Sequence, residues 1–221
     1  MLNPAIVLER PLRLKAWHFF LLLLVCEMTL SWIYQTRIMT YETYQALYSD
    51  RLEVQRIADI FQMIKRLNAW GIGMIPLITW VRLAFVVLLL QMPLVFRFID
   101  IPFREIFRIV TQASFFFIMM ELVKLSYLLN LPASSMSLSA LTFTPLSLVH
   151  LFSRADFSTA ALAFLSHFNL FEIAFLFFIY QGLLRTKKLK KFDAALVVFI
   201  LWTIIIVMHW IVVLYLERFK S

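Results

Sequence analysis

Five long apolar segments constrain this chain more than any other feature, because a helix needs about 20 apolar residues to cross a hydrocarbon core about 30 Å thick. They cover residues 16–34, 77–97, 106–129, 160–184 and 193–216. Backbone groups cannot stay unpaired in lipid, so each segment is expected to be helical. The sequence therefore predicts an all-α membrane protein, a five-transmembrane-helix bundle that forms a single integral membrane domain over residues 1–221.

The composition agrees with a membrane protein. Hydrophobic residues make up 62% of the chain and charged residues 15%, against about 45–50% and 25% in soluble domains. The net charge of +8 comes from basic residues that cluster beside the apolar segments. We therefore expect the lipid bilayer as a partner, and no nucleic acid. The single cysteine, Cys26, excludes a disulfide within the chain.

The basic residues also predict the orientation. They collect before the first segment, between the second and third, and between the fourth and fifth. Five crossings put these three places on one side, and the positive-inside rule makes that side cytoplasmic. The N-terminus is then cytoplasmic and the C-terminus outside. The last of these turns holds five cations that we interpret as topology determinants or lipid-headgroup contacts: Arg185, Lys187, Lys188, Lys190 and Lys191.

Two external segments, residues 35–76 and 130–159, are more than linkers. Within the first, residues 41–70 place apolar side chains at helical spacing, which predicts an external amphipathic helix lying on the membrane, on a partner, or as a cap over the protein's own outer face. The apolar positions are Val54, Ile57, Phe61, Ile64 and Leu67. Gly71, Gly73 and Pro76 are expected to end this helix.

The second external segment contains residues 131–156, which are rich in Ser and Thr and interrupted by Pro132 and Pro145. Two interpretations stay open. The stretch is either a re-entrant or interfacial hairpin, or a plain loop with a short surface helix.

Seven polar residues lie inside the predicted spans: Glu27, Arg82, Glu121, Lys124, His167, Asn169 and Glu172. A lone charge at the bilayer centre costs at least about 2.5–3.5 kcal/mol. Several such independent costs are implausible in one small chain, so we expect the acids and bases to pair. The alternatives are a structural polar network, a lined cavity or ion path, and a proton relay through Glu172 or His167.

Spacing suggests individual pairs. Glu121 and Lys124 are three residues apart and can pair within one helix. Arg82 then has Glu27 or Glu172 as a partner on another helix. His167 and Glu172 are five residues apart, about 140° around a helix, and are expected to face different neighbours.

Catalysis has little support in the sequence. No His-Glu-x-x-His, Gly-x-Ser-x-Gly, phosphate-binding loop or dinucleotide motif is present. The four histidines lie on separate segments without ligand spacing. We therefore predict a protein that is not an enzyme, with no catalytic residue, no cofactor and no metal.

The chain resembles the Yip family, a Ypt/Rab-interacting type of polytopic membrane domain that is widespread in bacteria. The resemblance is clearest in PLSLVHLF from Pro145 and in NLFEIAFLFFIYQGLLRTKKLKKFDA, where residues 169–173 match the family's N-L-F-E-I stretch. Family members often have Trp where this chain has Ala174, and the acidic Asp-Leu-Tyr-Gly segment of eukaryotic members is absent. The resemblance implies a five-helix bundle in a bacterial inner membrane that associates with other membrane proteins, and it gives no reason to expect Rab-type GTPase binding.

Two functional hypotheses follow. The first is a non-enzymatic accessory or scaffold subunit of a larger membrane assembly. The alternative is a small permease or lipid-handling transport subunit, with a polar cavity open to the outer side and lined by Glu27, Arg82, Glu121, Lys124, His167 and Glu172.

Overall fold

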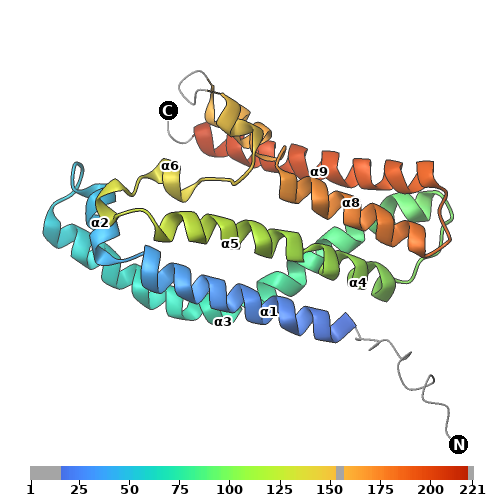
Figure 1. The fold of residues 1–221 in the computed structure, drawn as a ribbon, viewed down its shortest axis with the longest axis horizontal. Helices are drawn as coiled ribbons and strands as arrows, with labels where there is room; N and C mark the ends of the chain where they lie inside the picture. The colour runs from blue at the N-terminus through green and yellow to red at the C-terminus, as the bar shows by residue number, and fades with distance from the viewer. Residues whose placement is uncertain (1–15, 153–156, 219–221) are drawn as a thin grey trace, which may run out of the picture.

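A computed structural model describes residues 16–152 and 157–218 of the chain (Figure 1). Within these ranges the ordered elements are all helical, which confirms the predicted all-α class. In chain order they are α1 Ala16–Ile33, the π-helical turn η2 Tyr34–Ile38, α2 Tyr41–Tyr48, α3 Val54–Phe96, α4 Phe103–Ala113, α5 Phe115–Leu129, η3 Ala133–Ser135, α6 Leu138–Leu141, η4 Leu148–Leu151, α7 Thr159–Ser166, α8 Leu170–Arg185 and α9 Lys191–Arg218.

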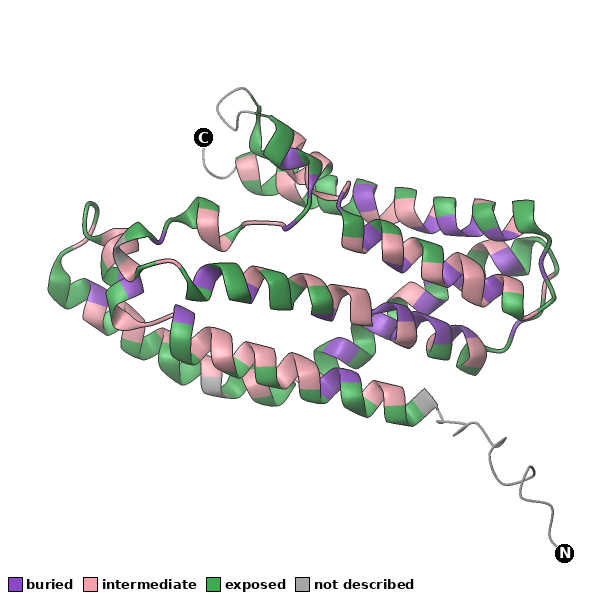
Figure 2. Cartoon of the chain, in the orientation of Figure 1, coloured by how far each residue is buried: buried purple, intermediate pink, exposed green. Residues whose placement is uncertain are grey.

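The long helices run side by side along the longest axis of the molecule (Figure 1). One end carries loops 97–102 and 186–190 and is called the basic end here; the other carries α2 and is called the α2 end. Helix α3 packs on α4 and α9, and α8 packs on α4, α5 and α9. Buried residues gather where these helices meet (purple in Figure 2). The most enclosed include Leu23, Leu83, Leu90, Ile106, Ile179 and Leu201.

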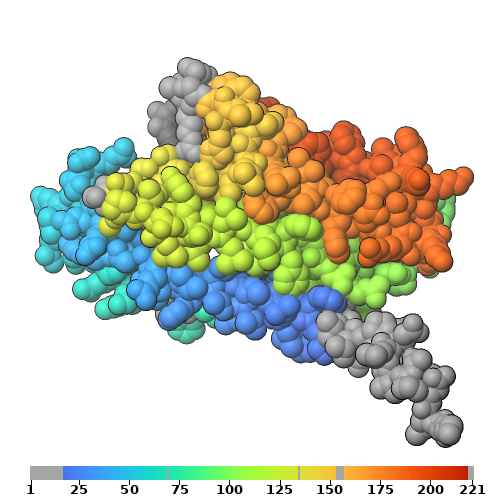
Figure 3. All heavy atoms as spheres, in the orientation of Figure 1, coloured from blue at the N-terminus to red at the C-terminus, as the bar shows by residue number. Residues whose placement is uncertain are grey.

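Four helical stretches are long and apolar enough to cross a membrane: Trp17–Ile38, Trp70–Phe96, Phe103–Leu129 and Lys191–Arg218. Large apolar side chains such as Val25, Leu88 and Phe199 are exposed on their outer faces. In the space-filling view, α5 lies against α1 on one side and against α8 on the other (Figure 3). An apolar exterior around a packed helical bundle is what a lipid environment requires.

The predicted fourth span, residues 160–184, is wrong as a single helix. It consists of α7 and α8, separated by a turn at residues 167–169. Asn169 caps α8, because its side-chain oxygen accepts a hydrogen bond from the Glu172 backbone N–H at 2.8 Å. Helix α8 has 16 residues, or about 24 Å, less than the thickness of a hydrocarbon core. Five spans are therefore not confirmed.

The predicted end of the 41–70 helix at Gly71, Gly73 and Pro76 is also wrong. Helix α3 passes through these residues and continues for 43 residues in all. Neighbouring helices and water can satisfy a backbone group freed by proline, which is why proline is tolerated inside membrane helices. Residues 41–70 instead form α2 and the first part of α3, with a break between them. A separate amphipathic helix lying on the bilayer is therefore not confirmed.

The first half of α3 packs on α2 through aromatic side chains. Phe61 lies 5.5 Å from Tyr44 and 5.8 Å from Tyr41 between ring centroids, and Ile57 is buried. Val54 and Leu67, which belong to the same predicted stripe, are exposed. The apolar stripe is thus only partly covered by the protein itself.

The predicted third helix, residues 106–129, begins earlier, at Phe103, and is divided at Ser114 into α4 and α5. The Ser114 hydroxyl donates to the Val110 carbonyl at 2.9 Å, and the Thr111 hydroxyl donates to the Phe107 carbonyl at 2.7 Å. Such bonds back to the preceding turn bend helices.

The described part of the 131–156 segment contains only short helical turns. It braces the start of α8: Leu148 N–H donates to the Phe168 carbonyl at 3.0 Å, and Leu170 N–H donates to the Leu146 carbonyl at 3.3 Å. Residues 153–156 lie outside the described ranges. The described portion fits a loop with short surface turns better than a helical re-entrant hairpin.

Candidate functional site

The seven polar residues predicted inside the spans form two separate clusters instead of one network. The Glu172 cluster consists of His167, Asn169 and Glu172 together with Trp202 and His209. The charged hollow is lined by four charged residues: Glu27, Arg82, Glu121 and Lys124. The two clusters differ in how their charges are satisfied.

Glu172 lies at the first turn of α8 and is 8% exposed. Its carboxylate is 3.0 and 3.1 Å from Nδ1 of His167. Trp202 of α9 donates its indole N–H to Oε1 at 3.1 Å, and the Asn169 amide donates to Oε2 at 3.3 Å. Both carboxylate oxygens therefore have partners within the protein, as a buried charge requires.

His167 and Glu172 contact each other, so the prediction that they face different neighbours is wrong. That prediction assumed one continuous helix, whereas the turn at 167–169 folds His167 back over the first turn of α8. An ionised carboxylate can only accept, so Nδ1 of His167 donates to it. Nε2 of His167 then meets Nδ1 of His209 at 2.7 Å. The neutral His167 accepts this second bond, and the doubly protonated form donates it.

Sequence reasoning missed Trp202 and His209 as members of this cluster. It also missed the reason for the carboxylate's position. Asn169 and Glu172 form an N-cap and N3 pair directly before an apolar run, which is the sequence pattern of a helix start. Asn-Leu-Phe-Glu was therefore a readable signal for the break at residue 169.

In the charged hollow, Arg82 of α3 pairs with Glu27 of α1, one of its two predicted partners. The Arg82 side chain is 51% exposed and that of Glu27 is 16% exposed. The hydroxyl of Thr79, which is buried, donates to the other carboxylate oxygen of Glu27. Thr79 is one turn from Arg82 on α3, and nothing in its residue type distinguished it in the sequence.

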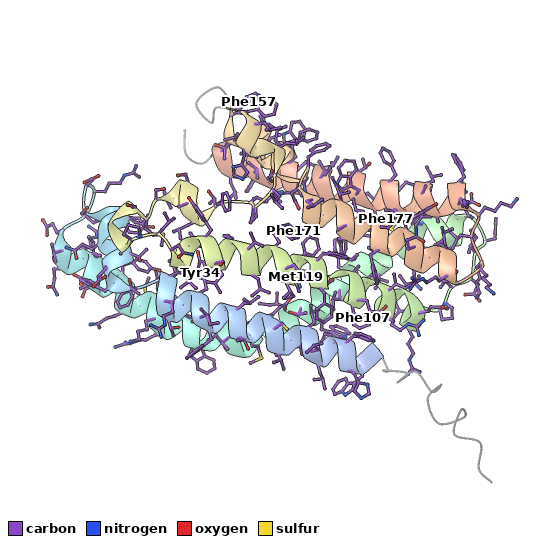
Figure 4. All side chains as sticks on the ribbon, viewed as in Figure 1. Tyr34, Phe107, Met119, Phe157, Phe171 and Phe177 are labelled. Atoms are coloured by element: carbon purple, nitrogen blue, oxygen red, sulfur yellow. The ribbon has the colours of Figure 1, made fainter. Side chains whose placement is uncertain are left out.

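Glu121 and Lys124 of α5 do not form the ion pair that their spacing predicted. Neither side chain makes an ion pair or a hydrogen bond with any other residue in the described ranges. Both line the hollow of about 440 Å³ between α1, α3 and α5, beside Ser31 and Tyr34. Tyr34 lies toward the α2 end, where α1 and α5 come together (Figure 4).

The five predicted headgroup contacts lie at the basic end and have different surroundings. Lys188 donates to the Asp100 carbonyl, and Lys187 adopts a left-handed conformation, φ 59°, just after α8. A neighbouring ion pair between Arg97 and Asp193 fastens α3 to α9. Arg185, Lys190 and Lys191 are exposed. Cations that face outward at one end of the bundle suit contact with acidic headgroups.

Within the described ranges, no three His, Cys, Asp or Glu side chains are placed to hold a metal ion together. The hydrogen bonds of the Glu172 cluster join α7, α8 and α9, and the charged hollow has room for a charged group. Comparisons with protein-family models, with curated proteins and with solved structures give no match to this chain. The resemblance to the Yip family stays a prediction.

Proposed function

We propose that this chain is a small lipid-handling membrane protein that binds the headgroup of a zwitterionic lipid in the charged hollow, without chemical conversion of the lipid. The observation that carries the proposal is that the charges of Lys124 and Glu121 are not paired by an ion pair or a hydrogen bond within the described ranges. Both are charged residues on the apolar stretch Phe103–Leu129, and both line the hollow.

A charged side chain inside the apolar layer of a membrane needs an opposite charge, a polar group or water beside it. An intramembrane charge faces the bundle interior or a water-filled cavity and marks a binding or transport path in most proteins. Counted back from Leu129, the outer end of the apolar stretch, Glu121 and Lys124 lie about 12 and 8 Å inside it. A hollow of about 440 Å³ falls within the usual range of small-ligand sites, about 300–1,000 Å³.

The balance of charge selects the class of ligand. Glu27 and Arg82 neutralise each other, which leaves one cation and one anion, Lys124 and Glu121, for a ligand. A zwitterionic headgroup such as phosphoethanolamine carries the matching pair. Its phosphate suits Lys124 and the hydroxyls of Ser31 and Tyr34, and its ammonium suits Glu121.

The proposal includes the predicted orientation. With the basic end in the cytoplasm of a bacterial inner membrane, the charged hollow lies in the outer half of the bilayer. Helices α1, α3 and α5 carry apolar exposed residues around it, so acyl chains can stay in lipid while the headgroup enters sideways.

The test is retention of lipid by the purified full-length protein. Native mass spectrometry in mild detergent, after reconstitution with phosphatidylethanolamine, should show bound lipid on the wild type. Lys124→Gln and Glu121→Gln should each lower the bound fraction about tenfold, because each removes a charge-assisted contact.

The matched control is Arg56→Gln, which removes an exposed cation from the first half of α3, away from the hollow. It should retain phosphatidylethanolamine like the wild type. Equal retention in all four proteins, or equal loss in Arg56→Gln and Lys124→Gln, would contradict the proposal.

A second candidate function is an accessory or scaffold subunit of a membrane assembly. It is favoured by an exposed apolar stripe on α3 that runs from the α2 end into the apolar stretch: Met63, Leu67, Trp70 and Met74. Trp70 is 80% exposed, and such a stripe suits a helix of another membrane protein. Purification from native membranes in mild detergent should then recover a fixed partner, and a lone monomer at every detergent concentration argues against it.

A further inference from the structure

A second polar hollow lies near the basic end, between α1, α4 and α8. It has a volume of about 480 Å³. Helix α4 contributes Arg108 and Gln112, and α8 contributes Gln181 and Arg185. Each pair is spaced i, i+4 and so lies on one face of its helix.

The two helices run in opposite directions, which sets the order of these side chains. Helix α4 begins at the basic end and α8 finishes there (Figure 1). Arg108 and Arg185 are therefore the pair nearer the basic end, and Gln112 and Gln181 are the deeper pair. The hollow presents two guanidinium groups at its mouth and two carboxamides behind them.

Helices α4 and α8, which line this hollow, pack closely against each other at its edge. A Cβ added to Gly182 would lie 2.4 Å from Cγ2 of Ile109. Only glycine allows this approach of α8 to α4, and both residues also line the hollow. The approach of the two helices that carry the four polar side chains is thus set by tight packing.

The polar groups of the hollow have little to bind within the protein. In the described ranges, Arg185, Gln112 and Gln181 have no ion pair or hydrogen-bond partner through their side chains. Arg108 is 4.0 Å from Glu105, at the limit of an ion pair, and its side chain is half exposed. Two guanidinium groups and one carboxylate give the hollow a net charge of +1.

We propose that this hollow binds a phosphate group with one negative charge, through Arg108 and Arg185 at its mouth and the amides of Gln112 and Gln181. Guanidinium groups bind phosphate oxygens in a bidentate manner, and amide N–H groups can complete the shell. Basic hollows between membrane helices at the cytoplasmic side are suited to acidic lipid headgroups. The proposal goes beyond the zwitterionic site, since it concerns other residues and another class of ligand.

The surroundings of the hollow favour a phospholipid as the source of the phosphate. Phe19 and Phe178 line it, together with Phe177, which Figure 4 labels on α8. Phe177 is 60% exposed, so an apolar surface leads from the arginines to the outside of the bundle. The carboxylate of Glu105 disfavours more highly charged phosphates, and a phosphodiester carries a single charge.

The experiment measures lipid retention by the full-length protein with phosphatidylglycerol as the probe. Native mass spectrometry should show phosphatidylglycerol on the wild type, and about tenfold less on Arg185→Gln and on Arg108→Gln. Arg104→Gln is the matched control, because Arg104 is an exposed cation at the same end that does not line the hollow. Equal losses in Arg185→Gln and Arg104→Gln would overturn the proposal, since they would show diffuse attraction.

A second arm distinguishes the two sources of phosphate. Inorganic phosphate and glycerol phosphate are added to the lipid-bound protein. If phosphatidylglycerol stays bound at millimolar concentrations of these competitors, the ligand is a phospholipid. If they displace it completely, the proposal that the phosphate comes from a phospholipid is overturned. Phosphatidylethanolamine retention by Arg185→Gln should equal that of the wild type, so failure of either site is seen separately.

Discussion

The Glu172 cluster and the charged hollow both place carboxylates within the helical bundle, but they satisfy them in different ways. Glu172 receives hydrogen bonds from His167, Asn169 and Trp202, and it is buried. Glu121 is exposed and lies near the cation Lys124 on α5, and in the described ranges neither forms an ion pair or a hydrogen bond.

The difference separates two uses of a charge inside an apolar bundle. A carboxylate whose oxygens are all occupied by the protein joins elements, here α7, α8 and α9. A cation and an anion left open beside each other are available to a ligand. Glu27 and Arg82 are intermediate, because they pair with each other while Arg82 stays half exposed.

The largest expected effect is that of Glu172→Ala. It removes the acceptor of the His167, Asn169 and Trp202 donors while the backbone cap bond to Asn169 remains, so the free energy of unfolding should fall by about 3–4 kcal/mol. Thermal unfolding in detergent, followed by circular dichroism, measures the loss. Leu170→Ala is the control, because Leu170 is exposed on the same turn and should cost less than about 1 kcal/mol. Similar values for the two variants would remove the distinction between the clusters.

An intermediate effect is expected for Glu27→Ala. Thr79 would lose its acceptor while buried, and Arg82 would lose its counter-ion, for a loss of about 1–2 kcal/mol after allowance for the exposure of Arg82. Arg82→Gln should cost less, because it leaves Thr79 bonded to Glu27. Chemical denaturation of the two variants in parallel gives the comparison. A larger loss in Arg82→Gln would show that the ion pair, and not the buried hydroxyl, stabilises this part of the hollow.

The smallest effect on stability is expected for Lys124→Gln and Glu121→Gln. Since neither residue has a protein partner in the described ranges, each change should alter the free energy of unfolding in lipid-free detergent by less than about 0.5 kcal/mol. Added phosphatidylethanolamine should raise the unfolding temperature of the wild type more than that of either variant. A large loss of stability without lipid would place these residues with Glu172 as structural.

Much of the bundle could be predicted because long apolar runs determine membrane helices with few alternatives. The need to neutralise charges in lipid also predicted that Arg82 pairs with an acid on another helix, with Glu27 and Glu172 as the two alternatives, and the structure selects Glu27. The positions where helices begin and end were harder to predict. Gly71, Gly73 and Pro76 indicate a helix end, whereas α3 continues through them. Conversely, Asn169 and Glu172 marked a helix start inside an apolar run that length alone assigned to one span.

The roles of Thr79 and Trp202 could not be predicted at all. Each acts through a residue on another helix, and their contacts depend on the rotation and offset of helices far apart in the chain. Lys124 and Glu121 show the opposite limit. Their spacing permits an ion pair within α5. Both side chains border the hollow, however, and the space there lets them adopt conformations in which they do not meet.

The length of α3 has a mechanical consequence. At 43 residues it forms a rod of about 64 Å, with Phe61 against α2 near one extremity and Arg82 past its middle. No loop lies between them, and Pro76 is the one proline in this part of the helix. A displacement of α2 can therefore reach the guanidinium that faces Glu27 only through a continuous helix whose natural bending point is Pro76.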